Sequence, residues 1–89
     1  MPDHPPARLG FTHNGTGLLC LWLEPWGRDY WLSPGETVTI FGDDPAGWFH
    51  LQHQEGDVAI YCEGSVRDAW VEREGTRLAC GHGRPTDAF

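Results

Sequence analysis

The stretch from Leu18 to Ile40, LLCLWLEPWGRDYWLSPGETVTI, limits most strongly what this chain can fold into. Its apolar runs are separated by two interruptions, at 24–27 and 33–35. Each interruption combines a proline, whose φ is fixed, with a glycine, which tolerates positive φ. Each is therefore expected to reverse the chain. Runs this short between turns predict strands rather than helices.

The length of the first turn decides which side chains share a face. An even-length loop at 24–27 places Leu23 opposite Arg28, and alternation along the strands then gathers one apolar face. That predicted core face consists of Leu19, Leu21, Leu23, Tyr30 and Leu32. The opposite face carries Cys20, Trp22 and Trp31, which makes it more apolar than a solvated face normally is. We expect it to be covered or to be an interaction surface.

Turn signals and alternation continue on both sides of this stretch. A strand at 8–13 is expected to form a hairpin with the run at 18–23 through Asn14-Gly15-Thr16-Gly17. A half-buried strand is expected at 36–41, followed by a loop at 42–47.

The second half of the chain is typical of a meander. A two-residue turn at Glu55-Gly56 puts Phe49, Leu51, Val58, Ile60 and Cys62 on one face. A second hairpin at Glu74-Gly75 does the same for Ala69, Val71, Leu78 and Cys80. The link at 63–65 does not keep this register, so an odd-length loop, a bulge or a crossing to another sheet is expected there.

No segment has a sustained helical period, and glycine and proline interrupt the chain about every eight to twelve residues. The sequence thus predicts an all-β fold, a small antiparallel β-sandwich or jelly-roll-like barrel of seven to eight short strands. A chain of 89 residues makes one domain. We assign it to residues 8–81, preceded by a proline-rich arm at 1–7 and followed by an irregular tail at 82–89, whose Phe89 can dock on the domain.

The central stretch also carries a recognisable pattern: Leu-x-Leu-Glu-Pro-Trp-Gly at 21–27, an aromatic residue at Tyr30, and Leu-x-Pro-Gly-Glu at 32–36. This pattern resembles a family of short bacterial proteins with no assigned activity, and in looser form the resemblance extends over residues 14–85. It implies an all-β domain and no substrate, cofactor or catalytic residue.

Charge excludes several classes of partner. The chain has 13 acidic and 6 basic residues, a net charge of −7, and no lysine. The positive patch that nucleic acids or anionic membranes require is missing, so neither is expected as a partner. The longest apolar run is too short to cross a bilayer, and the start has no export signal. We therefore expect a cytoplasmic protein with three reduced thiols, Cys20, Cys62 and Cys80.

Metal and catalytic motifs are weak. His50 and His53 point to opposite faces of a strand, so they cannot share a metal without a bulge. Cys80, His82 and His50 are the weak metal candidates, and no cofactor is expected. The turn at 33–36 is similar to that of small-barrel cupins. However, Gln52 stands where their paired histidine motif would need its second histidine, so cupin metal chemistry is not supported.

Five tryptophans in so short a chain are the strongest functional signal. Either some of them close the ends of the core, or they form a contact surface. The predicted interaction surface consists of Trp22, Trp26, Trp31, Trp48 and Trp70. The sequence favours a non-catalytic protein-interaction or accessory module that binds a protein partner or a second copy of itself. The alternative is a small metal- or ligand-binding enzyme of cupin-like architecture, built around Cys80, His82, His50 and Glu55.

Overall fold

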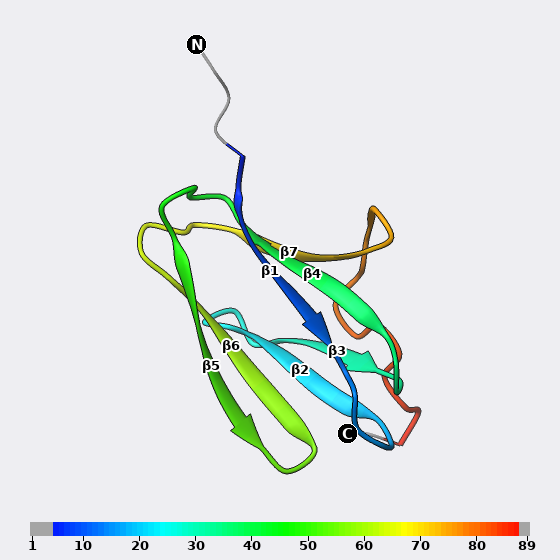
Figure 1. Cartoon of the computed structure of the whole chain (residues 1–89). Coiled ribbons are helices and arrows are strands. Elements are labelled where there is room, and N and C mark those ends of the chain that lie inside the picture. Colours follow the sequence, from blue (N-terminus) through cyan, green and yellow to red (C-terminus); the bar gives the residue numbers. More distant parts are fainter. Residues whose placement is uncertain (1–4, 88–89) are drawn as a thin grey trace.

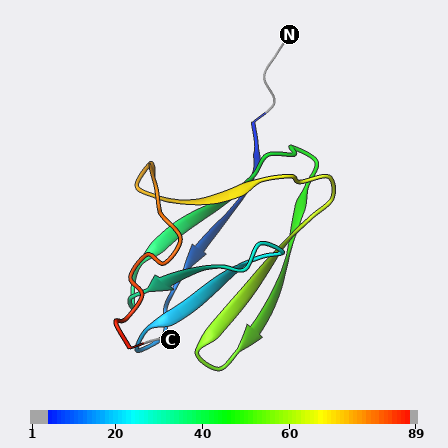
Figure 2. The same ribbon diagram turned by 180° about the vertical axis from the view of Figure 1, so that it is seen from behind.

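The computed structural model describes residues 5–87, and this part of the chain forms eight strands in two sheets (Figures 1 and 2). Residues 1–4 of the predicted arm, and Phe89, lie outside the described residues. The strands are β1 (Ala7–Thr12), β2 (Leu19–Glu24), β3 (Arg28–Leu32), β4 (Thr37–Gly42), β5 (Trp48–Gln54), β6 (Asp57–Glu63), β7 (Ala69–Arg73) and β8 (Thr76–Arg77). The predicted strands at 8–13, 18–23 and 36–41 lie within one residue of β1, β2 and β4.

The two sheets have four strands each and pack face to face. Sheet A has the order β1-β4-β7-β8, and sheet B has the order β3-β2-β6-β5. The predicted all-β sandwich is confirmed. Within the described residues no helix is long and apolar enough to span a membrane.

The core lies between the sheets and is made by alternate residues of the inner strands. All five residues of the predicted core face, Leu19, Leu21, Leu23, Tyr30 and Leu32, are buried there. Sheet B adds Val58 and Ile60, and sheet A covers them with Val38, Ile40, Ala69 and Val71. Burial of these aliphatic side chains is the main favourable contribution to the stability of a domain of this size.

Three turns have the register predicted from the sequence. Leu23 pairs with Arg28 across the 24–27 loop, so that loop is even in length. The turns at 55–56 and 74–75 join β5 to β6 and β7 to β8, with Gln54 opposite Asp57 and Arg73 opposite Thr76. The link at 63–65 crosses from sheet B to sheet A, which was one of the expected alternatives.

The hairpin predicted at Asn14–Gly17 is wrong. β1 pairs with β4 in sheet A and β2 pairs with β3 in sheet B, so this loop connects the sheets. His13 anchors it: its N–H donates to the Glu36 carbonyl, which extends the β1–β4 ladder. Its buried ring also bonds the loop, through the Gly17 carbonyl and the Gly15 N–H. The turn at 33–35 likewise carries the chain from β3 in sheet B to β4 in sheet A.

The expectation that all strands are antiparallel is also wrong. β2 and β6 are parallel neighbours, with Cys20 opposite Asp57 and Leu23 opposite Ile60. Parallel neighbours need a long connection, and here β3, β4 and β5 lie between them in the chain. The β5–β6 hairpin is thus placed beside β2, which makes sheet B mixed and puts β5 at its edge.

Candidate functional site

The outer face of sheet B combines aromatic and acidic side chains. Because alternate residues of a strand point to opposite faces, half of β2, β5 and β6 is directed away from the core. These three strands contain no lysine or arginine. The outward residues are Cys20, Trp22 and Glu24 from β2, Trp48, His50, Gln52 and Gln54 from β5, and Asp57, Ala59, Tyr61 and Glu63 from β6.

Two shallow hollows adjoin on this face. One, of about 300 Å³, is lined by Trp48, His50, Gln52, Tyr61 and Glu63. The other, of about 410 Å³, is lined by Trp22, Glu24, Gly27, Gln52, Gln54, Asp57, Ala59 and Tyr61. Because Gln52 and Tyr61 line both, the hollows form one continuous depression across three strands. We call it the sheet B groove.

Three of the five tryptophans of the predicted interaction surface lie on this face. Trp22, on β2, lines one of the two hollows of the sheet B groove, and Trp48, on β5, lines the other. Trp48 is 59% exposed, which is unusual for so large an apolar side chain. Trp31 lies on β3, opposite Cys20, at the other side of the face. Cys20 itself is buried, at 3% exposure.

The other two tryptophans lie elsewhere. Trp26, in the 24–27 turn, packs against the core, and the Arg28 guanidinium lies 5.4 Å from its ring centre. Trp70 is on the outer face of sheet A, where its ring stacks on that of Phe41 with 5.5 Å between the ring centres. The Arg77 guanidinium lies over the Trp70 ring, 4.7 Å from its centre. The structure therefore does not bring all five rings onto one surface.

The tail covers the β3 side of the face through Asp29. This carboxylate is 3% exposed. It accepts hydrogen bonds from the Arg84 guanidinium, from Trp31 Nε1 at 2.8 Å and from Cys80 Sγ at 3.5 Å. The Arg84 bonds, more than offsetting the effect of burial, hold the pKa of Asp29 well below its usual range.

Backbone bonds hold the same segment against β3. Trp31 N–H donates to the His82 carbonyl at 2.7 Å, and Gly81 N–H donates to the Asp29 carbonyl at 2.6 Å. Residues 81–82 thus pair with the outer edge of β3, where His82 forms a parallel bridge with Tyr30. The tail therefore caps this edge of sheet B.

Glu36 is a second buried carboxylate that holds the tail. It accepts the Ser33 N–H at 3.0 Å, bonds His82 Nε2 at 2.9 Å and lies 3.5 Å from Arg73 Nε. Burial raises its pKa, but these hydrogen bonds and charges outweigh burial and leave the pKa lowered. The Glu36 carboxylate therefore connects the 33–36 turn, β7 and the tail.

The weak metal candidates do not meet. Cys80 bonds Asp29 and His82 bonds Glu36, while His50 lies on β5 at the opposite edge of sheet B. Glu55, the fourth residue of the enzyme alternative, is in the β5–β6 turn. Among residues 5–87 no group of three or more His, Cys, Asp or Glu is arranged to hold a metal ion.

The three cysteines are free and differ in environment. Burial raises the pKa of Cys20 to about 12, with nearby Asp29 and Asp57 adding to the effect. Burial also raises the pKa of Cys62 to about 11. Cys80, which the alternation placed on the core face, is exposed instead. It leaves that face because the chain turns toward β3 after Leu78.

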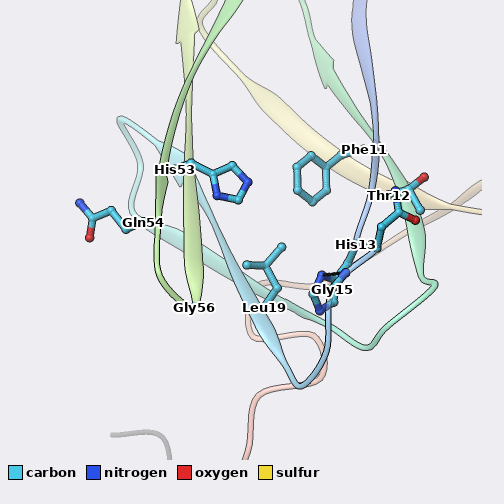
Figure 3. A pocket seen from close by; sticks show the side chains of 9 residues that line it. Phe11, Thr12, His13, Gly15, Leu19, His53, Gln54 and Gly56 are labelled. Atoms are coloured by element: carbon cyan, nitrogen blue, oxygen red, sulfur yellow. Dashed lines mark hydrogen bonds between the residues drawn. The ribbon is translucent and has the colours of Figure 1, made fainter.

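A separate slot opens between the edges of the two sheets (Figure 3). It has a volume of about 340 Å³ and lies between the end of β1 and the end of β5. Phe11 and His53 point toward one another across it, with Leu19 at its base. It contains no acidic or arginine side chain. The slot lies beside the 14–17 loop that connects β1 to β2, and Asn14 and Gly15 of this loop help to line it.

No family model matches this chain, and comparisons with curated proteins and with solved structures find no match. The fold defines a small β-sandwich domain, and any functional conclusion rests on its surface. Alternation in the sequence directs Tyr61, Gln52 and Asp57 away from the inward face of their strands. It does not show that they lie beside Trp22. Only the parallel pairing of β2 with β6 brings the two sets together.

Proposed function

We propose that this protein is a non-catalytic interaction module whose sheet B groove binds a basic segment of a partner protein. The proposal rests on the composition of the groove. Glu24, Asp57 and Glu63 stand among aromatic rings on strands that contain no lysine or arginine.

Arginine and lysine side chains fit this combination in two ways. Carboxylates accept charge-assisted hydrogen bonds from guanidinium and ammonium groups. Aromatic faces attract the same cations. Trp48, which is largely exposed and lines the groove, offers the kind of anchor around which interface contacts concentrate.

Charge also supports a protein over other partners. An acidic groove on a chain of net charge −7 repels phosphate groups, so nucleic acids and anionic membranes are not part of the proposal. A cytoplasmic location belongs to the proposal and is supported by three free thiols.

A fluorescence titration with an arginine- and lysine-rich peptide tests the proposal. We expect Glu63→Gln and Trp48→Ala each to weaken binding about threefold to tenfold, as losses of a rim charge and of an aromatic anchor do. We also expect binding to weaken as salt is raised. Glu74→Gln is the control, because it removes the same charge from the β7–β8 turn at a distance from the groove.

Two outcomes contradict the proposal. If Glu74→Gln weakens binding as much as Glu63→Gln does, the peptide responds only to net charge. If a neutral oligosaccharide binds instead, without response to salt or to Glu63→Gln, the ligand is a sugar stacked on the rings.

A further inference from the structure

β5 is an edge strand that the described part of the chain leaves uncovered. It lies at the end of sheet B, and β6 is its only strand partner within residues 5–87. Six of its seven residues are exposed. Leu51 is 41% exposed although it is on the inward face, because the β5–β6 hairpin splays away from β1 and β4 (Figures 1 and 2).

The direction of the backbone groups follows from one bond. Cys20 N–H donates to the Gly56 carbonyl at 3.1 Å, so that carbonyl points toward β2. Backbone groups alternate in direction along a strand, so every second residue of β6 from Asp57 onward points toward β5. The β5 residues paired with them direct their own N–H and C=O groups toward β6, and the β5 residues in between direct theirs away from β6. The N–H and C=O groups of Phe49, Leu51 and His53 are therefore directed to solvent.

The other sheet edges are protected. Residues 81–82 cap β3, and β8 has only two residues. β1 follows Pro5 and Pro6 and carries Arg8, and both proline and charge discourage pairing at an edge. β5 has no proline, aspartate, glutamate, lysine or arginine, and it has a regular ladder along its whole length. An unprotected edge of this kind invites another strand.

We propose that β5 pairs antiparallel with β5 of a second copy of this chain, around a two-fold axis at Leu51. Leu51 is the middle of the seven-residue strand, so this register pairs all of β5. Phe49 then faces His53 on the inward side, and Trp48 faces Gln54 and His50 faces Gln52 on the outward side. The outward-directed backbone groups form three hydrogen-bonded pairs, or about six bonds.

The charges of the chain leave β5 free to pair with a second copy. Two chains of net charge −7 repel one another wherever carboxylates meet. β5 contains no Asp or Glu, and in this register none stands opposite another across the new ladder. The exposed Leu51 side chains lie side by side, as a self-complementary interface requires. This pairing goes beyond the proposed binding of a basic partner and does not depend on it.

Sedimentation velocity on the full chain, from micromolar to about 1 mM, measures the association. We expect a monomer that becomes a dimer as concentration rises. Leu51→Pro removes the central outward N–H without touching the β5–β6 ladder, and it should abolish the dimer. Leu51→Ala keeps the N–H and should weaken the dimer less than Leu51→Pro does.

Gly10→Pro is the matched control. His13 N–H points toward β4, so by alternation the Gly10 N–H points to solvent, as that of Leu51 does. A Cβ at Gly10 meets no atom within 4 Å. This variant places a proline on the outer side of β1, the end strand of sheet A, and should dimerise like the wild type. Circular dichroism establishes that each variant is folded.

Amide hydrogen exchange on the wild-type chain supplies a readout that needs no variant. The amides of Phe49, Leu51 and His53 should become protected as concentration rises. A chain that stays monomeric at about 1 mM overturns the proposal. Three other results also overturn it. The dimer could survive Leu51→Pro, it could be lost in Gly10→Pro, or it could form while those three amides stay unprotected.

Discussion

Asp29 combines deep burial with hydrogen bonds from three side chains. Its oxygens face Arg84, Trp31 and Cys80 on the outer side of β3. A buried carboxylate is tolerated only when its charge is matched by donors of this kind. The alternation pattern had assigned this side of β3 to an apolar face, because Arg84 is far from it in the sequence. Within the described residues, the tail reaches β3 through the Arg84–Asp29 charge pair.

The lowered pKa values of Asp29 and Glu36 predict how stability depends on pH. A carboxyl whose pKa is lower when folded binds fewer protons than in the unfolded chain. Its contribution to stability is complete above the unfolded pKa of about 4 and is lost as pH falls through the folded value. We expect the free energy of unfolding to decrease steeply below about pH 4.

Urea unfolding at a series of pH values checks this expectation. Asp29→Asn should be less stable than the wild type at pH 7 and should lose less stability between about pH 4 and pH 2. The exposed Asp87→Asn variant is the control and should follow the wild-type curve. An unchanged acid dependence in Asp29→Asn would show that the Arg84 contact contributes nothing to folding.

At the scale of the strand, the faces assigned from alternation predict which truncations are costly. Leu21 and Ile60 are fully buried, one from β2 and one from β6. We expect Leu21→Ala and Ile60→Ala each to lower the free energy of unfolding by about 2–5 kcal/mol, enough to unfold much of so small a domain. Leu51→Ala is the matched control and should cost far less, because Leu51 is exposed. Thermal melts under dilute conditions, where the chain is monomeric, distinguish these results.

Alternation and turn chemistry determine much of this fold. The inward set of β2 and β3, the two-residue turns at 55–56 and 74–75, and the even loop at 24–27 all follow from local sequence. The partner of each strand does not. Asn14–Gly17 has the residues of a hairpin, yet the same residues suit a loop between sheets, and β1 finds β4 because the pair completes the cover over the core.

The same limit applies to the sheet B groove. The outward directions of Trp22, Trp48 and Tyr61 follow from alternation within each strand. Their common location does not, because it requires β6 to lie parallel to β2 with β5 beyond it. No residue in β2 or β6 specifies this choice, since both strands are apolar enough for the centre of a sheet. Long-range burial decides it.

For the molecule as a whole, the tail closes an edge that would otherwise be open. Removing residues 79–89 would expose the β3 backbone and leave Asp29 and Glu36 without Arg84 and His82. We expect the truncated chain to melt at a lower temperature and to aggregate on warming, as open edges do. Thermal unfolding followed by light scattering measures both effects.

The single variant Arg84→Gln separates the two contributions of the tail. It removes the charge pair but keeps the backbone bonds of residues 81–82 to β3. It should melt between the wild type and the truncated chain and should not aggregate. A truncated chain that melts with the wild type would show that the tail is dispensable for folding.

The parallel pairing of β2 with β6 also determines when the sandwich can fold. β2 obtains its first neighbour, β3, within a few residues, but its second is a strand that begins only at Asp57. A contact so distant in the chain is slow to form, and domains dominated by such contacts fold in roughly milliseconds to seconds. During synthesis, the apolar β2–β3 hairpin therefore emerges well before the strand that covers its open side. The growing chain spends that interval with its most hydrophobic segment available to chaperones.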